Sequence, residues 1–586
     1  MGGNTICGVS SASVDAHPCN IESVESINEE AHLSHVETQE SFDGSSNKDV
    51  FVDEYLSLAA NDHMTEEYIT TISLYSESDD TSDESEASEL SSSEDEGQEP
   101  SDGLNSLLRK WAVKHAYTRG SINELLGLLK SVGHDLPKDA RTLLRTKTSV
   151  DYKNKCGGQF IHLGLVNGIE KTVRSYNYDH DTILLDFNVD GLPLFKSSAT
   201  QLWPVLCRFE NTAPFIVSLF CGKLKPLNCG EFLADLLPEL SMVLLNGIVV
   251  DGRQFTCKIH TFVCDAPARA FLKGIIGHSC ERCTIKGSHF CNRVTFPGLT
   301  KTLRTNEKFR QSSYLSHDHC HQKELSPLVA VQMDLVNDFI LDYMHLVCLG
   351  VVRRLLYFWK GQIKGTNTGR LSATSTNIIS EKLIQFNGML PSEFVRQPRS
   401  LVLLDRWKAT ELRSFLLYTG LVALRDELSP VAYKHFLSLT IAIRILCSSS
   451  EDFRLKHLAN AETLLEYFVG NAPEHYGQEF NVYNVHGLLH IGDDVRYKCL
   501  PLYSFSCFPF EIFLYEVKKL VRGKHNPLVQ IVKRMAELDI IDKRSIKKSR
   551  KIQGCTKNLY FLTEKCIVGL IVCNCMTYNR IFILKQ

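Results

Sequence analysis

The chain has 586 residues, which is too many for one compact hydrophobic core, so we expect two or more domains. Its hydrophobic fraction of 44% is typical of a globular protein. The net charge of -4 averages two unlike parts: the first 102 residues hold 26 Asp and Glu with a single Lys, and the remainder holds 63 Lys and Arg against 42 Asp and Glu. A basic body suits a polyanionic partner such as nucleic acid, although a Lys-rich soluble surface would carry the same charge.

Neither end of the chain has the pattern of a targeting or membrane-spanning segment. The N-terminus, MGGNTICGVS, lacks the basic region and apolar run of a signal peptide, and the most apolar C-terminal stretch, CIVGLIVCNCM, is too short to cross a bilayer. We therefore expect an intracellular, reducing location without membrane association. The 20 Cys residues are then expected to be mostly buried thiols, with metal ligands where the spacing is right.

The N-terminal part of the chain changes character near residue 104. Residues 1–103 are rich in Ser, Asp and Glu and cannot bury enough apolar surface to fold, so we predict a disordered tail. Such a tail could simply be solvated, or it could shield the basic body or be phosphorylated. Residues 104–150 have apolar positions at helical spacing and predict a small helical hairpin, with Ser121 capping the second helix. This module could contact DNA, or its apolar stripe could serve only its own core.

The rest of the chain predicts an α/β protein. Between about 155 and 265, the runs TILLDFNVDGLPLF, PFIVSLFCG and QFTCKIHTFVCD are typical of strands, with one helix at FLADLLPELSMVLLNG. Between about 325 and 480 the pattern is helical, in LVNDFILDYMHLVCLGVVRRLLYFW, ATELRSFLLYTGLVAL, AYKHFLSLTIAIRIL and AETLLEYFVG. A further helix begins at PFEIFLYEVKKLVRG.

Two carboxylates follow predicted strands. Asp190 follows TILLDFNV and precedes Gly191, and Asp265 ends QFTCKIHTFVCD. An ordinary Asp-Gly hairpin turn would explain Asp190, and a helix cap would explain Asp265. On adjacent strands, however, two such carboxylates would converge on a divalent cation such as Mg²⁺. Two such metals can activate a water and stabilise the leaving oxygen in phosphodiester cleavage.

Two pairs of residues have the spacing of zinc ligands. Cys280 and Cys283 form a C-x2-C that lets two thiolates reach one Zn²⁺, and His486 and His490 are four apart, which places them on one helical face. Together they would complete a tetrahedral structural site. The alternative is two unrelated features, reduced cysteines and histidines at a helix end.

Two weaker features complete the pattern. Asp342 and His345 are three apart on one face of a predicted helix. Glu511 lies in the first turn of the last helix, where an acid also favours the helix dipole. The predicted buried stripe of that helix consists of Phe510, Phe513, Leu514, Val517 and Leu520.

The ordered set Asp, Asp, C-x2-C, D-x2-H, H-x3-H, Glu resembles the DDE transposases of the CACTA (En/Spm) group, relatives of the recombination-activating recombinase. The resemblance covers roughly residues 104–530 and includes NVDGLPLFKSSATQLWPVLC, CDAPARAFLKGIIGHSCERCTIKG and LDYMHLVCLGVVRRLL. It implies an RNase H-like catalytic core, a mixed sheet flanked by helices, interrupted by a large helical insertion. The expected parts are a tail (1–103), a helical module (104–150), the first part of the core (151–325), the insertion (326–500), the catalytic helix (501–535) and a basic, then β-rich, C-terminal segment that could be truncated (536–586).

The resemblance also implies the roles of the site residues. Asp190, Asp265 and Glu511 become the catalytic acids that hold Mg²⁺ or Mn²⁺, and His345 lies near the scissile phosphate. The ligands of a structural Zn²⁺ become Cys280, Cys283, His486 and His490. The implied reaction is metal-dependent cleavage at transposon ends followed by strand transfer, with double-stranded DNA as partner, a homodimer as the acting form and the nucleus as the location.

Two other functions fit the same residues. A transposase-derived DNA-binding or interaction protein without catalysis is favoured by the absence of a strong DNA-reading motif and by the abrupt C-terminal end. A zinc-stabilised scaffold without a nucleic-acid role is the third.

Overall fold

The structure is a computed structural model that describes residues 103–545, apart from 277–278, 300, 316–321, 364–368, 391–393 and 395. The tail predicted to be disordered lies, except for residue 103, outside the described residues, as do the short strands predicted after 556. Among the described helices, none is long and apolar enough to cross a membrane.

The N-terminal module consists of three helices, α2 (Leu104–Lys114), α3 (Arg119–Ser131) and α4 (Ala140–Leu144). They form a small core of their own from Ala112, Ile122, Leu126, Leu136, Ala140, Leu143 and Leu144. The predicted helical pair is therefore confirmed, but the predicted cap is wrong. Thr118 keeps an extended backbone and its hydroxyl accepts a hydrogen bond from the Ser121 backbone N–H at 3.1 Å, so α3 begins before Ser121.

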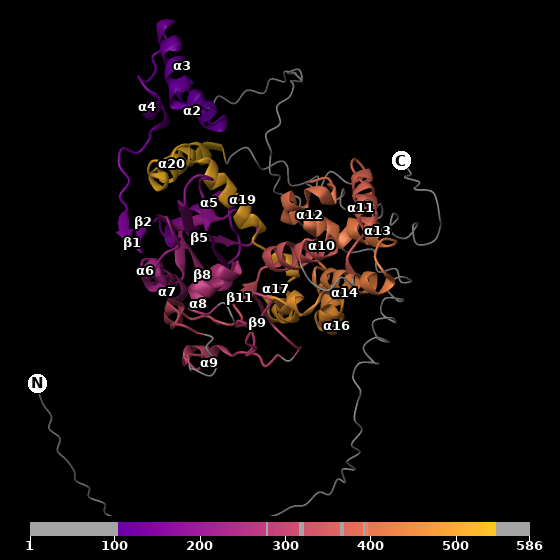
Figure 1. Cartoon of the computed structure of the whole chain (residues 1–586). Helices are drawn as coiled ribbons and strands as arrows, with labels where there is room; N and C mark the ends of the chain where they lie inside the picture. Colours follow the sequence, from indigo (N-terminus) through magenta and orange to yellow (C-terminus); the bar gives the residue numbers. More distant parts are fainter. Residues whose placement is uncertain are drawn as a thin grey trace, which may run out of the picture. The chain divides into compact units, whose positions relative to one another are not determined.

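A mixed sheet organises the next part of the chain (Figure 1). Its strand order is β1-β2-β6-β5-β3-β8-β11, with β4 paired to β5 and β7 to β8. Strands β3, β5 and β6 form an antiparallel meander, whereas β8 and β11 run parallel to β3. The strands are β1 (Lys153–Lys155), β2 (Gly158–His162), β3 (Thr182–Val189), β4 (Leu192–Pro193), β5 (Gln201–Phe209), β6 (Phe215–Gly222), β7 (Ile248–Val250), β8 (Arg253–Cys264) and β11 (Phe339–Leu341).

The two faces of the sheet contribute to different cores. In β3 the side chains of Ile183, Leu185, Phe187 and Val189 are fully buried in a core that also contains residues of the flanking helices. Because successive strand residues point to opposite faces, Asp186, Asn188 and Asp190 belong to the other face. The flanking helices are α5 (Leu165–Tyr176), α6 (Cys229–Leu233), α7 (Leu236–Asn246) and α8 (Ala266–Lys273). The sequence had predicted one helix where α6 and α7 lie, and neither α5 nor β5.

One predicted helix is wrong at its beginning. The segment LVNDFILDYMHLVCLGVVRRLLYFW does not start as a helix: residues 335–337 form a turn, and β11 follows, whose residues pair in parallel with Phe262–Cys264 of β8. All three residues of β11 are buried. A short apolar run that is buried on both faces cannot be distinguished from a buried helix by periodicity, and sheet pairing decides it. The helix proper follows as a π-helical segment (Met344–Val352) and α10 (Arg353–Trp359).

Between α8 and β11 lie β9 (Ser288–Phe290), β10 (Arg293–Thr295), α9 (Asn306–Arg310) and a 3-10 turn (Pro327–Ala330). The C-x2-C lies in the segment between α8 and β9, outside any named helix or strand. A helical region follows β11, and its core is continuous with Leu202, Leu206, Leu219, Val263 and Leu341 of the sheet. Its elements are α11 (Ala373–Gln385), a 3-10 turn (Leu401–Arg406), α12 (Ala409–Ser414), a π-helical segment (Phe415–Thr419), α13 (Gly420–Leu424), α14 (Pro430–Leu446), α15 (Glu451–Lys456), α16 (Leu458–Tyr476), α17 (Tyr483–Gly487), 3-10 turns (Gln478–Phe480, Leu488–His490, Leu502–Ser504) and α18 (Ile491–Lys498).

Two helices close the described part of the chain, α19 (Phe508–Lys519) and α20 (Pro527–Ser545). In α19, Phe510, Leu514 and Val517 are buried, and Phe513 and Leu520 are partly buried against the same core, as the apolar stripe predicted. The chain is thus a mixed α/β protein with a mixed sheet flanked by helices and a helical C-terminal region.

Candidate functional site

Asp190 lies at the point where β3 ends. The chain continues past it into β4, which pairs with β5 on the same side as β3 does, so Asp190 is not in a hairpin turn between β3 and β4. Its Oδ1 accepts a hydrogen bond from the Gly191 backbone N–H at 2.6 Å. A Cβ added to Gly191 would meet the Trp203 indole ring at 3.0 Å, so the absence of a side chain lets the backbone pack closely against that ring.

Asp265 directly follows the neighbouring parallel strand, β8. Its side chain caps α8 by accepting a hydrogen bond from the Ala268 backbone N–H at 2.8 Å. Asp265 therefore has the capping role that the sequence offered as an alternative, and one of its oxygens is occupied by that bond. The other oxygen has no such backbone partner among the described contacts, so a cap and a metal ligand are compatible here.

Glu511 approaches Asp190 from α19, far along the chain. Burial, the charge of Glu511, a hydrogen bond to Glu511 and the charge of Asp265 together raise the pKa of Asp190 to about 8. The strand-end acids and Glu511 are therefore near enough to repel one another. Among the described residues, however, the oxygens of these three carboxylates do not form a group within 4.8 Å of one another, whereas the Cys and His ligand atoms described below do.

His345 is the cation next to these acids. Its Nδ1 lies 2.6 Å from Asp342 Oδ2, and its Nε2 lies 3.8 Å from Glu511 Oε1. Burial alone would favour the neutral ring, but the hydrogen bond to Asp342 and the charges of Asp342, Asp190 and Glu511 raise the pKa of His345 to about 9. The imidazolium thus offsets part of the negative charge, and its Nε2–H faces the acids.

Asp342 holds His345 in place. It is fully buried, and its two oxygens accept hydrogen bonds from the backbone N–H groups of Met344, His345 and Cys507 in addition to the imidazole. The spacing had predicted Asp342 and His345 on one helical face. Asp342 instead precedes the helix and caps its first turn, while its bond to Cys507 fixes the residue from which α19 starts.

The four predicted zinc ligands come together as a closed set. Cys280, Cys283, His486 and His490 are buried, and their ligand atoms all lie within 4.8 Å of one another. Cys280 Sγ is 3.5 Å from His490 Nε2, Cys283 Sγ is 3.3 Å from His486 Nε2, and the two Nε2 atoms are 3.4 Å apart. In a tetrahedral zinc site with bonds of about 2.0–2.3 Å, neighbouring ligand atoms are about 3.3–3.8 Å apart. The set can therefore hold a metal ion of that kind.

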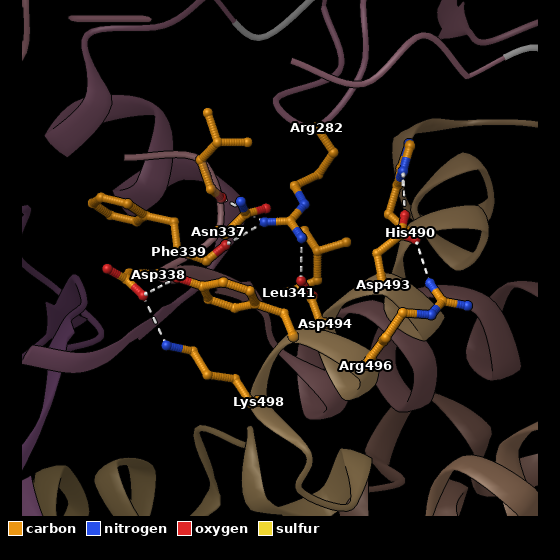
Figure 2. A network of polar contacts seen from close by, with 12 residues as sticks. Arg282, Asn337, Asp338, Phe339, Leu341, His490, Asp493, Asp494, Arg496 and Lys498 are labelled. Carbon is orange, nitrogen blue, oxygen red and sulfur yellow. Dashed lines mark hydrogen bonds and ion pairs between the residues drawn. The ribbon is translucent and has the colours of Figure 1, made fainter. Parts of the chain in front are cut away.

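Side chains around these ligands fix their orientation. His490 Nδ1 lies 3.7 Å from Asp493 Oδ2, which places a carboxylate behind the ring, and the Phe296 ring stacks on His486 at 5.2 Å. Figure 2 shows Asp493 between His490 and Arg496, whose guanidinium donates to Asp493 at 3.1 Å. The pair of histidines spans the end of α17 and a 3-10 turn, so the two rings converge although the segment is not one regular α-helix.

Sequence reasoning missed several residues of the two sites. Asn188 donates to the Val263 carbonyl at 2.8 Å, which ties β3 to β8 beside the strand-end acids. Cys507 donates through Sγ to the same carbonyl at 3.5 Å. The only sequence signal at Cys507 is Pro509 in the first turn of the helix, which marks where that helix starts. Asp493 could have been found, since it lies three residues after His490.

Neither a scan against models of known protein families nor a search of curated proteins found a match to this chain.

Proposed function

We propose that this chain is a DDE-type transposase, a metal-dependent enzyme that cleaves DNA strands and joins them to new sites. The observation that carries the proposal is the encounter of Glu511 with Asp190 beside Asp265, where burial and the two neighbouring acids together raise the pKa of Asp190 to about 8. Carboxylates that repel one another at a partly exposed position are stabilised when a divalent cation binds between them.

We also propose that the sheet is an RNase H-like core. The proposal is supported by the meander of β3, β5 and β6, by the two further strands parallel to β3, and by the positions of the acids at the ends of the adjacent strands β3 and β8. In this proposal the helical region between β11 and α19 would be the insertion, and the position of Glu511 after it in the chain supports that assignment.

Each residue then has a defined task. Asp190, Asp265 and Glu511 would hold Mg²⁺ or Mn²⁺, and the bound ions would supply an activated water and charge stabilisation at the leaving oxygen. His345 presents an N–H from beside Glu511, where it can donate a hydrogen bond to a phosphate oxygen, and Asp342 keeps that N–H pointing toward the acids. The four Cys and His ligands would hold a structural Zn²⁺.

The substrate in this proposal is double-stranded DNA at transposon ends, and the basic charge of the body, 63 Lys and Arg against 42 acidic residues after residue 102, suits it. The same proposal includes that the protein acts in the nucleus and that it acts as a homodimer. A transposase-derived DNA-binding protein without catalysis would use the same fold, but its three acids would not support metal-dependent cleavage.

The test is nicking of supercoiled plasmid DNA that carries the genomic sequences flanking the gene, in Mn²⁺. The wild-type chain should nick it, and Asp190→Asn and Glu511→Gln should lose at least about 10²-fold of the rate, the scale expected when one charge-stabilising group is lost. Glu516→Gln is the matched control, since Glu516 lies on the same helix with its side chain 59% exposed. It should nick as the wild type does.

Two results would contradict the proposal. If Asp190→Asn and Glu511→Gln nick as fast as the wild type, the acids are not the catalytic groups. Salt-dependent binding of the plasmid with no cleavage in any divalent metal would favour the non-catalytic DNA-binding protein, and absence of DNA binding would exclude both functions.

A further inference from the structure

The two residues between the cysteines, Glu281 and Arg282, are buried charges. Glu281 is 1% exposed and Arg282 3% exposed, although acidic and basic side chains are rarely buried unless they are paired. In a C-x2-C that only holds a metal, these two positions have no need of buried charge. Their partners show what the charges do.

Glu281 connects the cysteines to the strand end that carries Asp265. Its Oε1 accepts from Arg269 Nε at 2.6 Å, and its Oε2 accepts from Lys273 Nζ at 3.2 Å. Both cations lie on α8, the helix that Asp265 caps, and both are buried. Arg269 also donates to the carbonyl of Cys264, the residue immediately before Asp265. One bridging side chain therefore separates Glu281 from the backbone that positions Asp265.

Arg282 makes the equivalent connection to Asp342. Its guanidinium donates to Asp494 and to the carbonyls of Val336 and Phe339, which lie on either side of the start of β11 (Figure 2). The second oxygen of the fully buried Asp494 accepts from the Leu341 backbone N–H at 3.0 Å. Leu341 is the residue immediately before Asp342, so again one bridging side chain reaches the backbone of the acid site.

The network also includes the histidine half of the metal site. Tyr483, on the helix that carries His486, donates to Glu281 Oε1 and accepts from Arg269 at 3.3 Å. Asp494 follows Asp493, the residue behind His490, on α18. A buried charge that loses its partner is strongly destabilising. These ion pairs therefore fix the positions of the two halves of the metal site and of the two strand ends relative to one another.

We infer that Glu281 and Arg282 are positioning residues that transmit occupancy of the Cys/His metal site to the acid site, Glu281 toward Asp265 and Arg282 toward Asp342 and His345. The consequence for catalysis rests on the proposed function, whereas the mechanical connection does not. Loss of the metal frees the segment that contains Glu281 and Arg282, and both strand ends then lose their fixed partners.

The first arm of the test measures amide hydrogen exchange in the full chain, zinc-loaded and after removal of zinc with 1,10-phenanthroline. Zinc removal should raise exchange in 265–274 and in 339–346, while α5, which contains none of the residues that bond Glu281 or Arg282, stays protected. With zinc still bound, Glu281→Gln should raise exchange only in 265–274, and Arg282→Gln only in 339–346. A general loss of stability would raise exchange in both segments in each variant, so a response confined to one segment per variant distinguishes the two explanations.

Glu411→Gln is the matched control, because Glu411 is also buried and both of its oxygens accept from Arg399 at 2.6 Å, in a different part of the core. It should leave both segments unchanged. If a Gln variant fails to retain zinc, Glu281→Asp and Arg282→Lys, which keep the charge, should restore both zinc and protection. A chain that binds no zinc, segments that do not respond to zinc removal, or variants that raise exchange equally throughout would each overturn the inference.

The second arm measures Mn²⁺ affinity of the zinc-loaded chain by calorimetry. Glu281→Gln should weaken Mn²⁺ binding at the acids by about 10-fold or more, as is typical when a residue behind a metal ligand is lost, and Glu411→Gln should not. If the wild type binds no Mn²⁺ at the acids, the proposed function fails, and the exchange pattern still decides the role of Glu281 and Arg282. If Mn²⁺ affinity is unchanged in Glu281→Gln, the transmission to Asp265 is contradicted.

Discussion

The Cys/His site and the acid site lie on connected elements but differ in almost every physical respect. The four Cys and His ligands are buried, converge within 4.8 Å and have a carboxylate behind one ring. The acids lie at a partly exposed edge, where the Glu511 side chain is 37% exposed, and burial together with their mutual repulsion raises the pKa of Asp190 to about 8. A closed set of ligands is typical of a structural metal, and an open set with unbalanced charge is typical of a site that must admit a substrate.

This contrast predicts its largest effect at the closed site. Cys283→Ser should abolish stoichiometric zinc binding and lower the free energy of unfolding by several kcal/mol, since structural zinc contributes about 10–16 kcal/mol in small zinc domains. Zinc content and thermal unfolding of the full chain measure it. Cys291→Ser is the control, because Cys291 is exposed, and it should retain both zinc and stability. A Cys283→Ser chain with a full complement of zinc would exclude this site.

The open site should respond in the opposite way. Asp190→Asn should reduce Mn²⁺-dependent nicking by at least about 10²-fold. It should also raise the melting temperature of the metal-free chain near pH 7, because burial and Glu511 raise the pKa of Asp190 to about 8 and folding must therefore protonate this acid at a cost in free energy. Differential scanning calorimetry in EDTA, with zinc content checked, measures the second effect. A variant that loses both nicking and stability would mean that Asp190 has a structural role like that of Asp342.

His345 should have a smaller effect. His345→Asn keeps a side chain with an N–H donor but removes the positive charge that faces Glu511. The nicking rate should fall by about 10- to 100-fold, which does not exceed the lower limit of about 10²-fold for a typical acid–base contribution. Asp342→Asn should be more damaging to folding, since Asp342 accepts bonds from three backbone N–H groups. Nicking rate and melting temperature distinguish the two. Equal loss of stability in both variants would contradict the separate roles.

The metal affinity of the open site should depend on pH. In the metal-free chain the pKa of Asp190 is about 8, raised by burial and by Glu511, so at pH 7 about nine in ten molecules hold a proton that the metal must displace. Mn²⁺ affinity should therefore rise about tenfold for each pH unit from 6 toward 8 and level off above 8. Calorimetric titrations at several pH values measure it, and an affinity that is flat over that range would show that Asp190 is not a ligand.

The same contrast explains what the sequence could predict. Both zinc half-sites and the strand-end acids were predictable, because C-x2-C, H-x3-H and a strand followed by Asp are short-range patterns. The strand β11 was predicted as helix, because Phe339–Leu341 is buried on both faces and only its pairing with β8 distinguishes the two. The bond between Arg282 and Asp494 joins residues that are 212 positions apart in the sequence, and no local sequence pattern predicts such a pairing. The distance between Asp190 and Glu511 likewise depends on how the helical region returns the chain to the sheet.

The most direct test of the account is an anomalous diffraction map from crystals of the chain soaked in Mn²⁺. We predict manganese within bonding distance of carboxylate oxygens of Asp190 and Glu511, with Asp265 as a further ligand, and a separate zinc signal among Cys280, Cys283, His486 and His490. Zinc at the Cys/His site with no manganese at the acids, at a concentration that saturates nicking, would contradict the central claim.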